Sequence, residues 1–263
     1  MDLREFVFLP LVYRLAATLE QMTWHDLAED PPSATYALRS ARSLFGLSAM
    51  VTHFRVGVEA EACGADLGRD DEGDWSAPRG LADAAALTAE ALDRAPVAQI
   101  LDVTRRLAEE LRGTAPAVGV VTGPRTLGAL FDGRPDLGQF YAALARAYAE
   151  RGVQMLLVVE RPGSGPAPEG FSFAPLFNVL NYFRVPAVLL DPEHTTPTAG
   201  FRLAAQRPLP LAALEGEPSN VEVWRREGGP LLLTEWEVPP RLPAQRLAAW
   251  VEAFTRGARV VHG

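Results

Sequence analysis

Carboxylates, histidines and one arginine stand where apolar runs of this sequence end. The residues in such positions are His53, Arg55, Glu160, Asp191, Glu193, His194, Glu215, Glu217, Glu235, Glu237 and His262. Carboxylate oxygens and imidazole nitrogens together form a donor set that can bind a divalent metal ion. A single carboxylate with a raised pKa can instead act as a general acid. These residue types therefore predict either a metal site or an acid–base site.

The apolar runs predict the elements that would position these residues. The run that starts at Ala117 is small, apolar and β-branched as far as Gly123, which is typical of a strand buried on both faces. Gly123 and Pro124 end the strand, and Thr126 can cap the helical spacing that follows. A strand, a turn and a helix form the repeat of parallel α/β proteins, which bind ligands at the carboxyl ends of their strands. We therefore expect Gly123 and Pro124 to contact the substrate.

Eight such runs predict the whole fold. We expect strands over Phe6–Val12, Leu47–Val56, the run from Ala117, Val153–Glu160, Val185–Asp191, Leu209–Glu215, Pro230–Glu237 and Ala258–His262. Helices are expected over Leu15–Phe45 with a break at Pro31-Pro32, Glu59–Gly64, Leu81–Leu92, Val97–Leu111, Leu137–Arg151, Phe173–Phe183, Val221–Glu227 and Pro243–Arg256. Gly68–Gly80 and Arg161–Gly170 read as surface loops. The alternation predicts an α/β fold, a single-domain (β/α)8 TIM barrel over residues 1–263, with its site at the C-terminal mouth.

Composition excludes several kinds of chemistry. All 25 basic residues are arginine, so a pyridoxal-phosphate (PLP) lysine, a Schiff-base lysine and a Walker A loop are absent from this sequence. Cys63 is the one cysteine, which rules out an intrachain disulfide, a cysteine-rich zinc site and an iron–sulfur cluster. The net charge of −8 argues against nucleic acid as a partner, and no apolar run reaches the ~20 residues of a membrane span. We expect a cytoplasmic protein that binds a small-molecule substrate, and a homodimer stays open.

Four segments carry a family resemblance. They are VEAEACGADL at residues 58–67, VGVVTGPRTL at 118–127, ARAYAERGVQMLLVVE at 145–160 and ARVVHG at 258–263. In their residues and in their order along the chain, they resemble segments of the uroporphyrinogen decarboxylase superfamily. That superfamily also includes corrinoid- and zinc-dependent methyltransferases. The resemblance implies a TIM barrel, and it implies a functional histidine or cysteine at the place of His262.

The sequence departs from both branches of that superfamily. Where the decarboxylases carry an arginine-rich segment for substrate carboxylates, this chain reads LPLVYRL and offers only Arg14. The place of their aspartate lies near Arg55, and Leu130 stands at the place of their tyrosine. Where the methyltransferases bind zinc with His-x-Cys, this chain reads Asp191-Pro192-Glu193-His194.

The candidate residues divide by expected role. We expect His262, Glu160 and Asp191 to carry out catalysis, and Arg55, Gly123, Pro124, Glu215 and Glu235 to bind substrate. Glu193, His194 and His262 are the expected ligands if the unidentified cofactor is a divalent metal.

Structural roles compete with these expectations. Asp191 is also a good helix N-cap, and Glu160 can pair with Arg161 or Arg184. Glu235 and Glu237 would point the same way along a regular strand and could face solvent, while His53 could be a hydrogen-bonded structural residue.

Three functions remain open at this point. The first is a decarboxylase-like lyase acting on a small-molecule or tetrapyrrole substrate, with acid–base chemistry from His262 and the strand-end carboxylates. The second is a corrinoid-linked methyltransferase with an altered metal site. The third is a non-catalytic barrel that binds a ligand or a partner.

Overall fold

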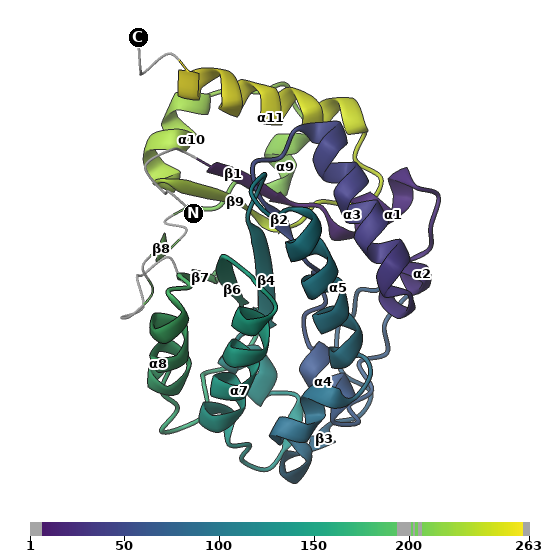
Figure 1. The fold of residues 1–263 in the computed structure, drawn as a ribbon, viewed down its shortest axis with the longest axis vertical. Coiled ribbons are helices and arrows are strands. Elements are labelled where there is room, and N and C mark those ends of the chain that lie inside the picture. The colour runs from purple at the N-terminus through teal and green to yellow at the C-terminus, as the bar shows by residue number, and fades with distance from the viewer. Residues whose placement is uncertain (1–6, 194–200, 202, 205–206, 260–263) are drawn as a thin grey trace.

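Parallel strands form the centre of the molecule, and helices surround them (Figure 1). The computed structural model describes residues 7–193, 201, 203–204 and 207–259. The central strands are β1 (Val7–Leu11), β2 (Met50–Val51), β4 (Ala117–Thr122), β6 (Met155–Val159), β7 (Ala187–Leu190), β8 (Leu203–Ala204) and β9 (Leu231–Glu237). This mixed α/β architecture is the predicted TIM-barrel type.

The pairing of the strands follows the order of a barrel. One parallel sheet has the order β2-β4-β6-β7-β8, and β1 pairs with β9 in a second parallel sheet. Leu209 forms a parallel bridge with Thr234 of β9, so it takes the place between β8 and β9. Hydrogen-bond pairing among the described residues does not join β1 to β2 or β8 to Leu209. The eight-place ring is therefore not closed by hydrogen bonds.

The helices and a small outer sheet complete the fold. The α-helices are α1 (Tyr13–Leu19), α2 (Trp24–Glu29), α3 (Pro31–Phe45), α4 (Val58–Ala62), α5 (Val97–Glu110), α6 (Pro124–Gly128), α7 (Leu137–Glu150), α8 (Ala174–Phe183), α9 (Leu211–Leu214), α10 (Val221–Gly228) and α11 (Ala244–Arg259). Two 3₁₀-helices, η1 (Ala84–Ala86) and η2 (Ala89–Asp93), follow β3 (Ala82–Asp83), which pairs with β5 (Phe131–Asp132). Within the described ranges, no helix combines the length and apolar character needed to cross a bilayer.

Burial on both faces explains the apolar runs. Successive residues of β6 alternate between two hydrophobic clusters: Met155 and Leu157 pack with β1, β9, α1 and α3, whereas Leu156 and Val158 pack with α5, α7 and α8. A strand covered on both sides needs apolar residues at every position, as the sequence predicts for a parallel sheet.

The strand register sets the layout of the mouth. Thr122 of β4 pairs with Val159 of β6, and Val159 pairs with Leu190 of β7. The next residues along these strands are Gly123, Glu160 and Asp191, so they leave the sheet side by side. On the other side of the ring, Leu11 of β1 pairs with Glu237 of β9.

Two predicted strands are wrong in their position. Ala258 and Arg259 continue helix α11 instead of starting an eighth strand, and β9 occupies the place beside β1 that this strand was expected to fill. In the predicted strand Leu209–Glu215 only Leu209 is paired, because helix α9 starts at Leu211 with Pro210 as its N-cap. The short strand β8, between β7 and Leu209 in the chain, was not predicted.

Two further segments differ from the prediction. The predicted helix Leu81–Leu92 is instead β3 and two 3₁₀-helices, since Ala82 pairs with Phe131 and the Asp83 side chain accepts a hydrogen bond from the Ala85 N–H. These contacts override the helical propensity of an alanine-rich segment. The second predicted strand, Leu47–Val56, is reduced to Met50–Val51, and its ladder ends where the N–H of Thr52 donates to the carbonyl of Val118 at 2.9 Å.

Candidate active site

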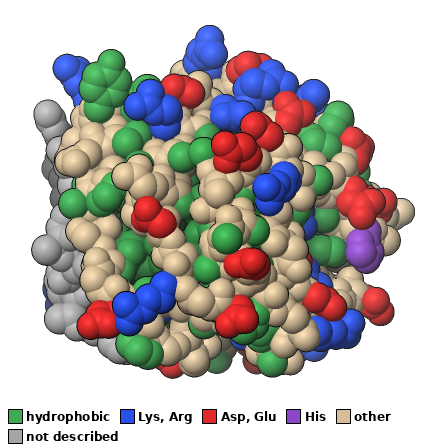
Figure 2. All heavy atoms as spheres, turned by 90° about the horizontal axis from the view of Figure 1, so that it is seen from below, with side chains coloured by type: hydrophobic (Ala, Val, Ile, Leu, Met, Phe, Trp, Pro, Cys, Tyr) green, Lys and Arg blue, Asp and Glu red, His purple; other side chains and the backbone are tan. Residues whose placement is uncertain are grey.

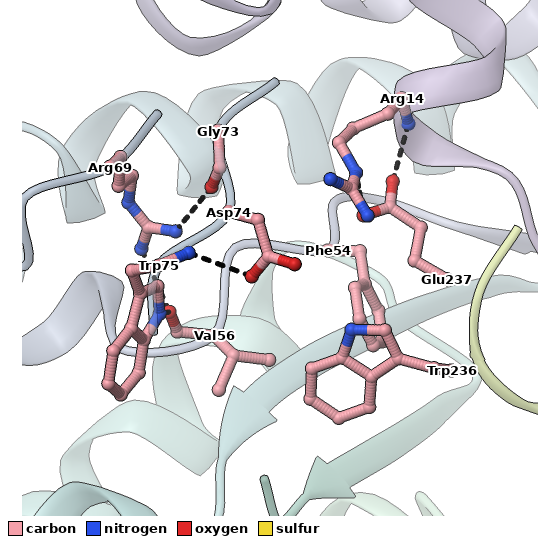
Figure 3. Close-up of a pocket in the computed structure, with 9 residues that line it drawn as sticks. All are labelled: Arg14, Phe54, Val56, Arg69, Gly73, Asp74, Trp75, Trp236 and Glu237. Carbon is pink, nitrogen blue, oxygen red and sulfur yellow. Dashed lines mark hydrogen bonds and ion pairs between the residues drawn. The ribbon is translucent and has the colours of Figure 1, made fainter. Parts of the chain in front are cut away.

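A small pocket lies at the carboxyl ends of β1, β2 and β9 (Figure 3). Its lining residues are Arg14, Phe54, Val56, Arg69, Gly73, Asp74, Trp75, Trp236 and Glu237. Its volume is ≈ 250 Å³, including the open solvent at its entrance. Charged groups of both signs and three aromatic rings therefore share one concave surface, which is typical of a small-molecule site.

Glu237 and Arg14 form a buried ion pair on the pocket wall. The backbone N–H of Arg14 donates to Oε1 of Glu237 at 2.5 Å, and Nε of Arg14 donates to Oε2 at 2.6 Å. Glu237 ends β9 and Arg14 lies in the first turn of α1, so the β1–β9 pairing brings the two together. Burial raises the pKa of Glu237 to about 7, although the charge and hydrogen bonds of Arg14 oppose this and Asp74 adds repulsion. The Glu237 carboxyl can thus exchange a proton near neutral pH.

Aromatic rings form the rest of the wall. Phe54 follows β2 and meets Trp236 of β9 edge to face, with ring centroids 5.1 Å apart. Trp75 is buried and donates its indole N–H to the carbonyl of Val56 at 3.1 Å. The guanidinium of Arg161 stacks on Trp75 at 4.3 Å from the ring centroid.

The Gly68–Gly80 segment covers one side of the pocket. Arg69 holds it to the barrel by donating to the carbonyl of Val56 at 2.8 Å and by pairing through Nε with Glu61 at 2.7 Å. Within the segment, Arg69 also donates to the carbonyl of Gly73 at 2.8 Å. Arg161, which follows β6, donates to the carbonyls of Trp75 and Ser76. The predicted surface loop is therefore part of the pocket.

A second polar cluster lies at the ends of β4, β6 and β7. Arg125 of α6 pairs with Asp191 at 2.6 Å and with Glu193 at 2.9 Å. It also donates to the carbonyls of Gly165 and Ser164. One guanidinium therefore ties the loop after β6 to the end of β7.

Sequence and fold comparisons identify the family to which the chain belongs. A family model described as uroporphyrinogen decarboxylase (URO-D) matches residues 11–149, more than half of the chain. The chain belongs to the uroporphyrinogen decarboxylase family. No curated protein matches it in sequence. Among solved structures, a methyltransferase from Methanosarcina mazei has a similar fold, with a TM-score of 0.73, 13% identity, and coverage of 97% of this chain and 94% of that one.

Glu160, expected to act in catalysis, has both carboxylate oxygens engaged by α6. It accepts hydrogen bonds from the N–H groups of Arg125 and Thr126, each at 2.9 Å, and from the Thr126 hydroxyl at 2.7 Å. Burial raises the pKa of Glu160, and these hydrogen bonds oppose the rise. The predicted ion pairs with Arg161 or Arg184 are not among the contacts described for Glu160. Its contacts are those of a helix-capping group, and a catalytic role stays a prediction.

Asp191, Gly123 and Pro124 lie in the same cluster as Glu160. Oδ1 of Asp191 accepts from the N–H of Glu193 at 3.1 Å, while Oδ2 pairs with Arg125. Pro124 is the first residue of α6, and a Cβ at Gly123 would come within 2.3 Å of the Glu160 carboxyl carbon. The expected grouping of these residues is present, but it lies apart from the residues that line the pocket of Figure 3.

Arg55 and His53 are not among the residues that line the pocket. Arg55 is buried, donates to the carbonyl of Ala28 at 3.2 Å and lies 5.2 Å from the Trp24 ring centroid. His53 contacts the carbonyl of Val120 at 2.8 Å and the hydroxyl of Tyr148 at 2.7 Å. Burial, with the nearby charge of Arg55, lowers the pKa of His53 to about 3, so its ring is neutral. The structural role for His53 fits these contacts.

Glu215 and Glu235 belong to the region of α9. Oε1 of Glu235 accepts from the N–H of Leu211 at 2.8 Å, at the start of α9, and Glu215 is exposed at its end. Glu235 and Glu237 thus contact different elements. The register of β1 and β9 shifts opposite Pro10, which has no N–H to donate, and this irregularity breaks the expected alternation.

The expected metal ligands are only partly within the described chain. His194 and His262 lie outside the described residues. Glu193 accepts from the Gly163 N–H at 2.9 Å and pairs with Arg125, so its carboxylate faces a positive group. Across the residues that the structure describes, no three His, Cys, Asp or Glu side chains are grouped to hold a metal. Glu193 as arranged does not fit a cation site, and the metal site stays a prediction.

The sequence does not predict the residues that line the pocket. Glu237 is one of the strand-end acids and Arg14 is the arginine after the first strand, yet no pattern assigns either of them a role. The same holds for Asp74, Trp75 and Trp236. A tryptophan inside an acidic, glycine-rich loop was the available signal, because a large aromatic side chain is seldom left on a free loop.

Proposed function

We propose that this chain is a decarboxylase-like enzyme of the uroporphyrinogen decarboxylase family. It removes a carboxylate from a small substrate held in the pocket of Figure 3, and Glu237 supplies the proton. One observation carries the proposal: a buried carboxyl group with a pKa raised to about 7 lines the pocket at a strand end. In TIM-barrel enzymes such positions hold the reacting groups.

The reaction balances with Glu237 as the acid. The carbon–carbon bond to the substrate carboxylate breaks, CO₂ leaves, and the electron pair passes into a carbonyl or electron-poor heteroaromatic ring of the substrate. The proton of the Glu237 carboxyl then moves to the carbon that held the carboxylate. Near pH 7 the group is protonated in a large fraction of molecules, which suits an acid that must be reloaded each cycle.

The aromatic wall favours the same step. A carboxylate bound in the pocket, beside the Phe54 and Trp236 rings, gives up part of its hydration, whereas the CO₂ formed from it carries no charge to hydrate. Loss of CO₂ is therefore helped by an apolar surface that would disfavour a retained carboxylate.

The size of the pocket favours a small substrate over a tetrapyrrole. Pockets for drug-sized ligands measure roughly 300–1,000 Å³, whereas the space in this one is ≈ 20 Å³, room for about one water molecule. Four linked pyrrole rings would require the Gly68–Gly80 segment to leave its contacts with Val56, Glu61 and Arg161. Corrinoid-linked methyl transfer and ligand binding without catalysis are the rival functions.

The test is a screen for CO₂ release from small carboxylic acids that carry a β-carbonyl group or a heteroaromatic ring. The wild type is compared with Glu237→Gln, which removes the proton but keeps an acceptor for Arg14. Glu150→Gln, on the outer helix α7, makes the same charge change as a control. For a substrate that is turned over, we expect Glu237→Gln to lower kcat about 10²-fold or more.

The outcomes separate the three functions. Turnover that persists in Glu237→Gln overturns the role of Glu237. A panel with no CO₂ release overturns decarboxylation of this substrate class. Methyl transfer from a methylated corrinoid to a small thiol, measured with the same protein, would establish the second function instead.

A further inference from the structure

We propose that the pocket binds a zwitterion, with the carboxylate of the ligand at Arg14 and its ammonium group at Asp74. This inference rests on the proposed function in that it names the substrate class of the same pocket. It is carried by the hydrogen-bonding atoms that the two side chains leave unused on the pocket wall (Figure 3).

Arg14 retains donor capacity toward the pocket. Its backbone N–H and Nε bind Glu237, and Nη1 makes a long contact of 3.4 Å with the carbonyl of Glu72. Nη2 has no hydrogen-bond partner among the described residues. Among those residues, the buried side-chain atoms that lack a partner are Arg42 Nε, Arg55 Nε and Arg225 Nη1, so Nη2 of Arg14 is accessible to solvent. A guanidinium edge that is positioned by a carboxylate and reaches solvent is a binding group for an incoming carboxylate.

Asp74 retains acceptor capacity on the same wall. Its Oδ1 accepts from the N–H of Trp75 at 2.8 Å and lies 3.9 Å from Nη2 of Arg161. Its Oδ2 has no hydrogen-bond partner in the part of the chain that the structure describes. In Figure 3 the Asp74 carboxylate lies between Trp75 and the Arg14–Glu237 pair. Asp74 also raises the pKa of Glu237, which shows that the two carboxylates repel each other across the pocket.

The other charges of the wall are already compensated. Arg69 pairs with Glu61 at 2.7 Å and donates to two carbonyls, and Arg161 stacks on Trp75. An ammonium group at Asp74 would pair with its unused Oδ2, and a ligand carboxylate at Arg14 would balance the added charge. The Phe54 and Trp236 rings offer an apolar surface for the carbon chain that separates the two groups.

The experiment varies the distance between the two charges of the ligand with a series of ω-amino acids. Isothermal titration calorimetry measures binding of the series from glycine to 6-aminohexanoate to the full chain, and of the carboxylate and the amine of matched length. We expect one length to bind best, at least about ten-fold tighter than either singly charged analogue.

Two asparagine variants locate the ammonium site. Asp74→Asn keeps an acceptor for the Trp75 N–H but removes the charge, so it should reduce affinity for the best ω-amino acid about ten-fold and leave the plain carboxylate unaffected. Asp71→Asn makes the same change at an exposed place in the same loop and should bind as the wild type does. Circular dichroism and melting temperature establish that both variants fold.

The results distinguish this inference from the proposed function. Equal binding of the zwitterion and either singly charged analogue, no binding of any member, or full affinity in Asp74→Asn overturns the zwitterion site. Binding that passes these tests without CO₂ release from any substrate leaves the site standing and overturns the decarboxylase. Release of CO₂ only from substrates that lack an amine leaves the decarboxylase standing and overturns the zwitterion site.

Discussion

Two buried carboxylates, Glu160 and Glu237, have different surroundings at the strand ends. Burial raises the pKa of both. Glu160 accepts three hydrogen bonds from the start of α6, so both of its oxygens serve to stabilise that helix. Within the described part of the chain, Glu237 accepts hydrogen bonds from Arg14 only, and it lines a pocket. The residue that can reach a ligand is therefore Glu237.

Glu237 should make stability depend on pH. Its folded pKa of about 7 lies above the unfolded value of 4.5, so its contribution is fully present below pH 4.5 and is lost as pH rises through 7. Between pH 5 and 8 we expect the wild type to lose about 2 kcal/mol of unfolding free energy relative to Glu237→Gln. Urea denaturation of both proteins at several pH values measures the difference. Parallel curves would show that the Glu237 pKa is not raised.

Helix α6 illustrates how an element positions the second cluster. Pro124 begins it, the Glu160 carboxylate binds its first free N–H groups, and Arg125 extends from it to Asp191 and Glu193. Because Gly123 has no Cβ, the Glu160 carboxylate can lie against the strand end.

Gly123→Ala should disrupt this arrangement. The added Cβ would come within 2.3 Å of the Glu160 carboxyl carbon, so the carboxylate must leave its hydrogen bonds. Overpacking of this kind costs about 1–3 kcal/mol, and we expect a loss of about 2 kcal/mol. Gly165→Ala, in the loop tied to the same Arg125, meets open space and should stay within about 0.5 kcal/mol of the wild type. Equal stabilities of the two variants would contradict the role given to Glu160.

The Gly68–Gly80 segment is an element without regular structure that is nevertheless packed. Trp75 anchors it, and Gly73 lies so close to Trp24 that a Cβ would come within 2.0 Å of the indole. Burial of a tryptophan, rather than polar composition, decides where this loop lies.

Trp75→Ala should release the segment. Without the indole, the loop loses its buried side chain and its hydrogen bond to Val56, so the backbone around Arg69 and Arg79 opens to trypsin more often. We expect cleavage at these two arginines to be about ten-fold faster than in the wild type, since proteolysis follows the population of the open segment. Tyr182→Ala, at a side chain that is 82% exposed, is the control and should leave the rate unchanged. A rate in Trp75→Ala equal to the control would mean that the loop does not depend on its tryptophan.

At the scale of the whole molecule, charge is mixed over a negative average. The chain carries a net charge of −8, and the face in Figure 2 shows acidic and arginine side chains interspersed, without a broad basic area among the described residues. The arginines near the pocket are engaged by carboxylates, carbonyls or an aromatic ring.

Uroporphyrinogen should therefore be a poor substrate. A polycarboxylate needs free cations, because a buried carboxylate without a partner costs several kcal/mol. In an anaerobic assay of acetate decarboxylation we expect turnover more than ten-fold below that of a true uroporphyrinogen decarboxylase, a difference of more than about 1.4 kcal/mol in the barrier. Turnover within ten-fold would show that the pocket opens to admit a tetrapyrrole.

Much of the fold could be predicted because its signals are local. The strands β1, β4, β6, β7 and β9 follow apolar runs, and α3, α5, α7, α8 and α11 follow helical spacing. The Thr23 side chain caps α2 by accepting a hydrogen bond from the N–H of Asp26, a contact between residues three apart in the sequence. The errors fall on short segments such as Ala82–Asp83 and Leu203–Ala204, where partners distant in the chain decide the state.

The sequence by itself determined the parallel α/β fold and the family, because strands buried on both faces must be apolar throughout and the family's motifs lie in a fixed order. Only the tertiary structure decided which strand-end group is a candidate acid. The partner of Glu237 is Arg14, 223 residues away in the chain, and the repelling carboxylate of Asp74 comes from a loop. Burial and charge pairing shift a pKa through neighbours in space, and the order of residues in the chain does not specify those neighbours.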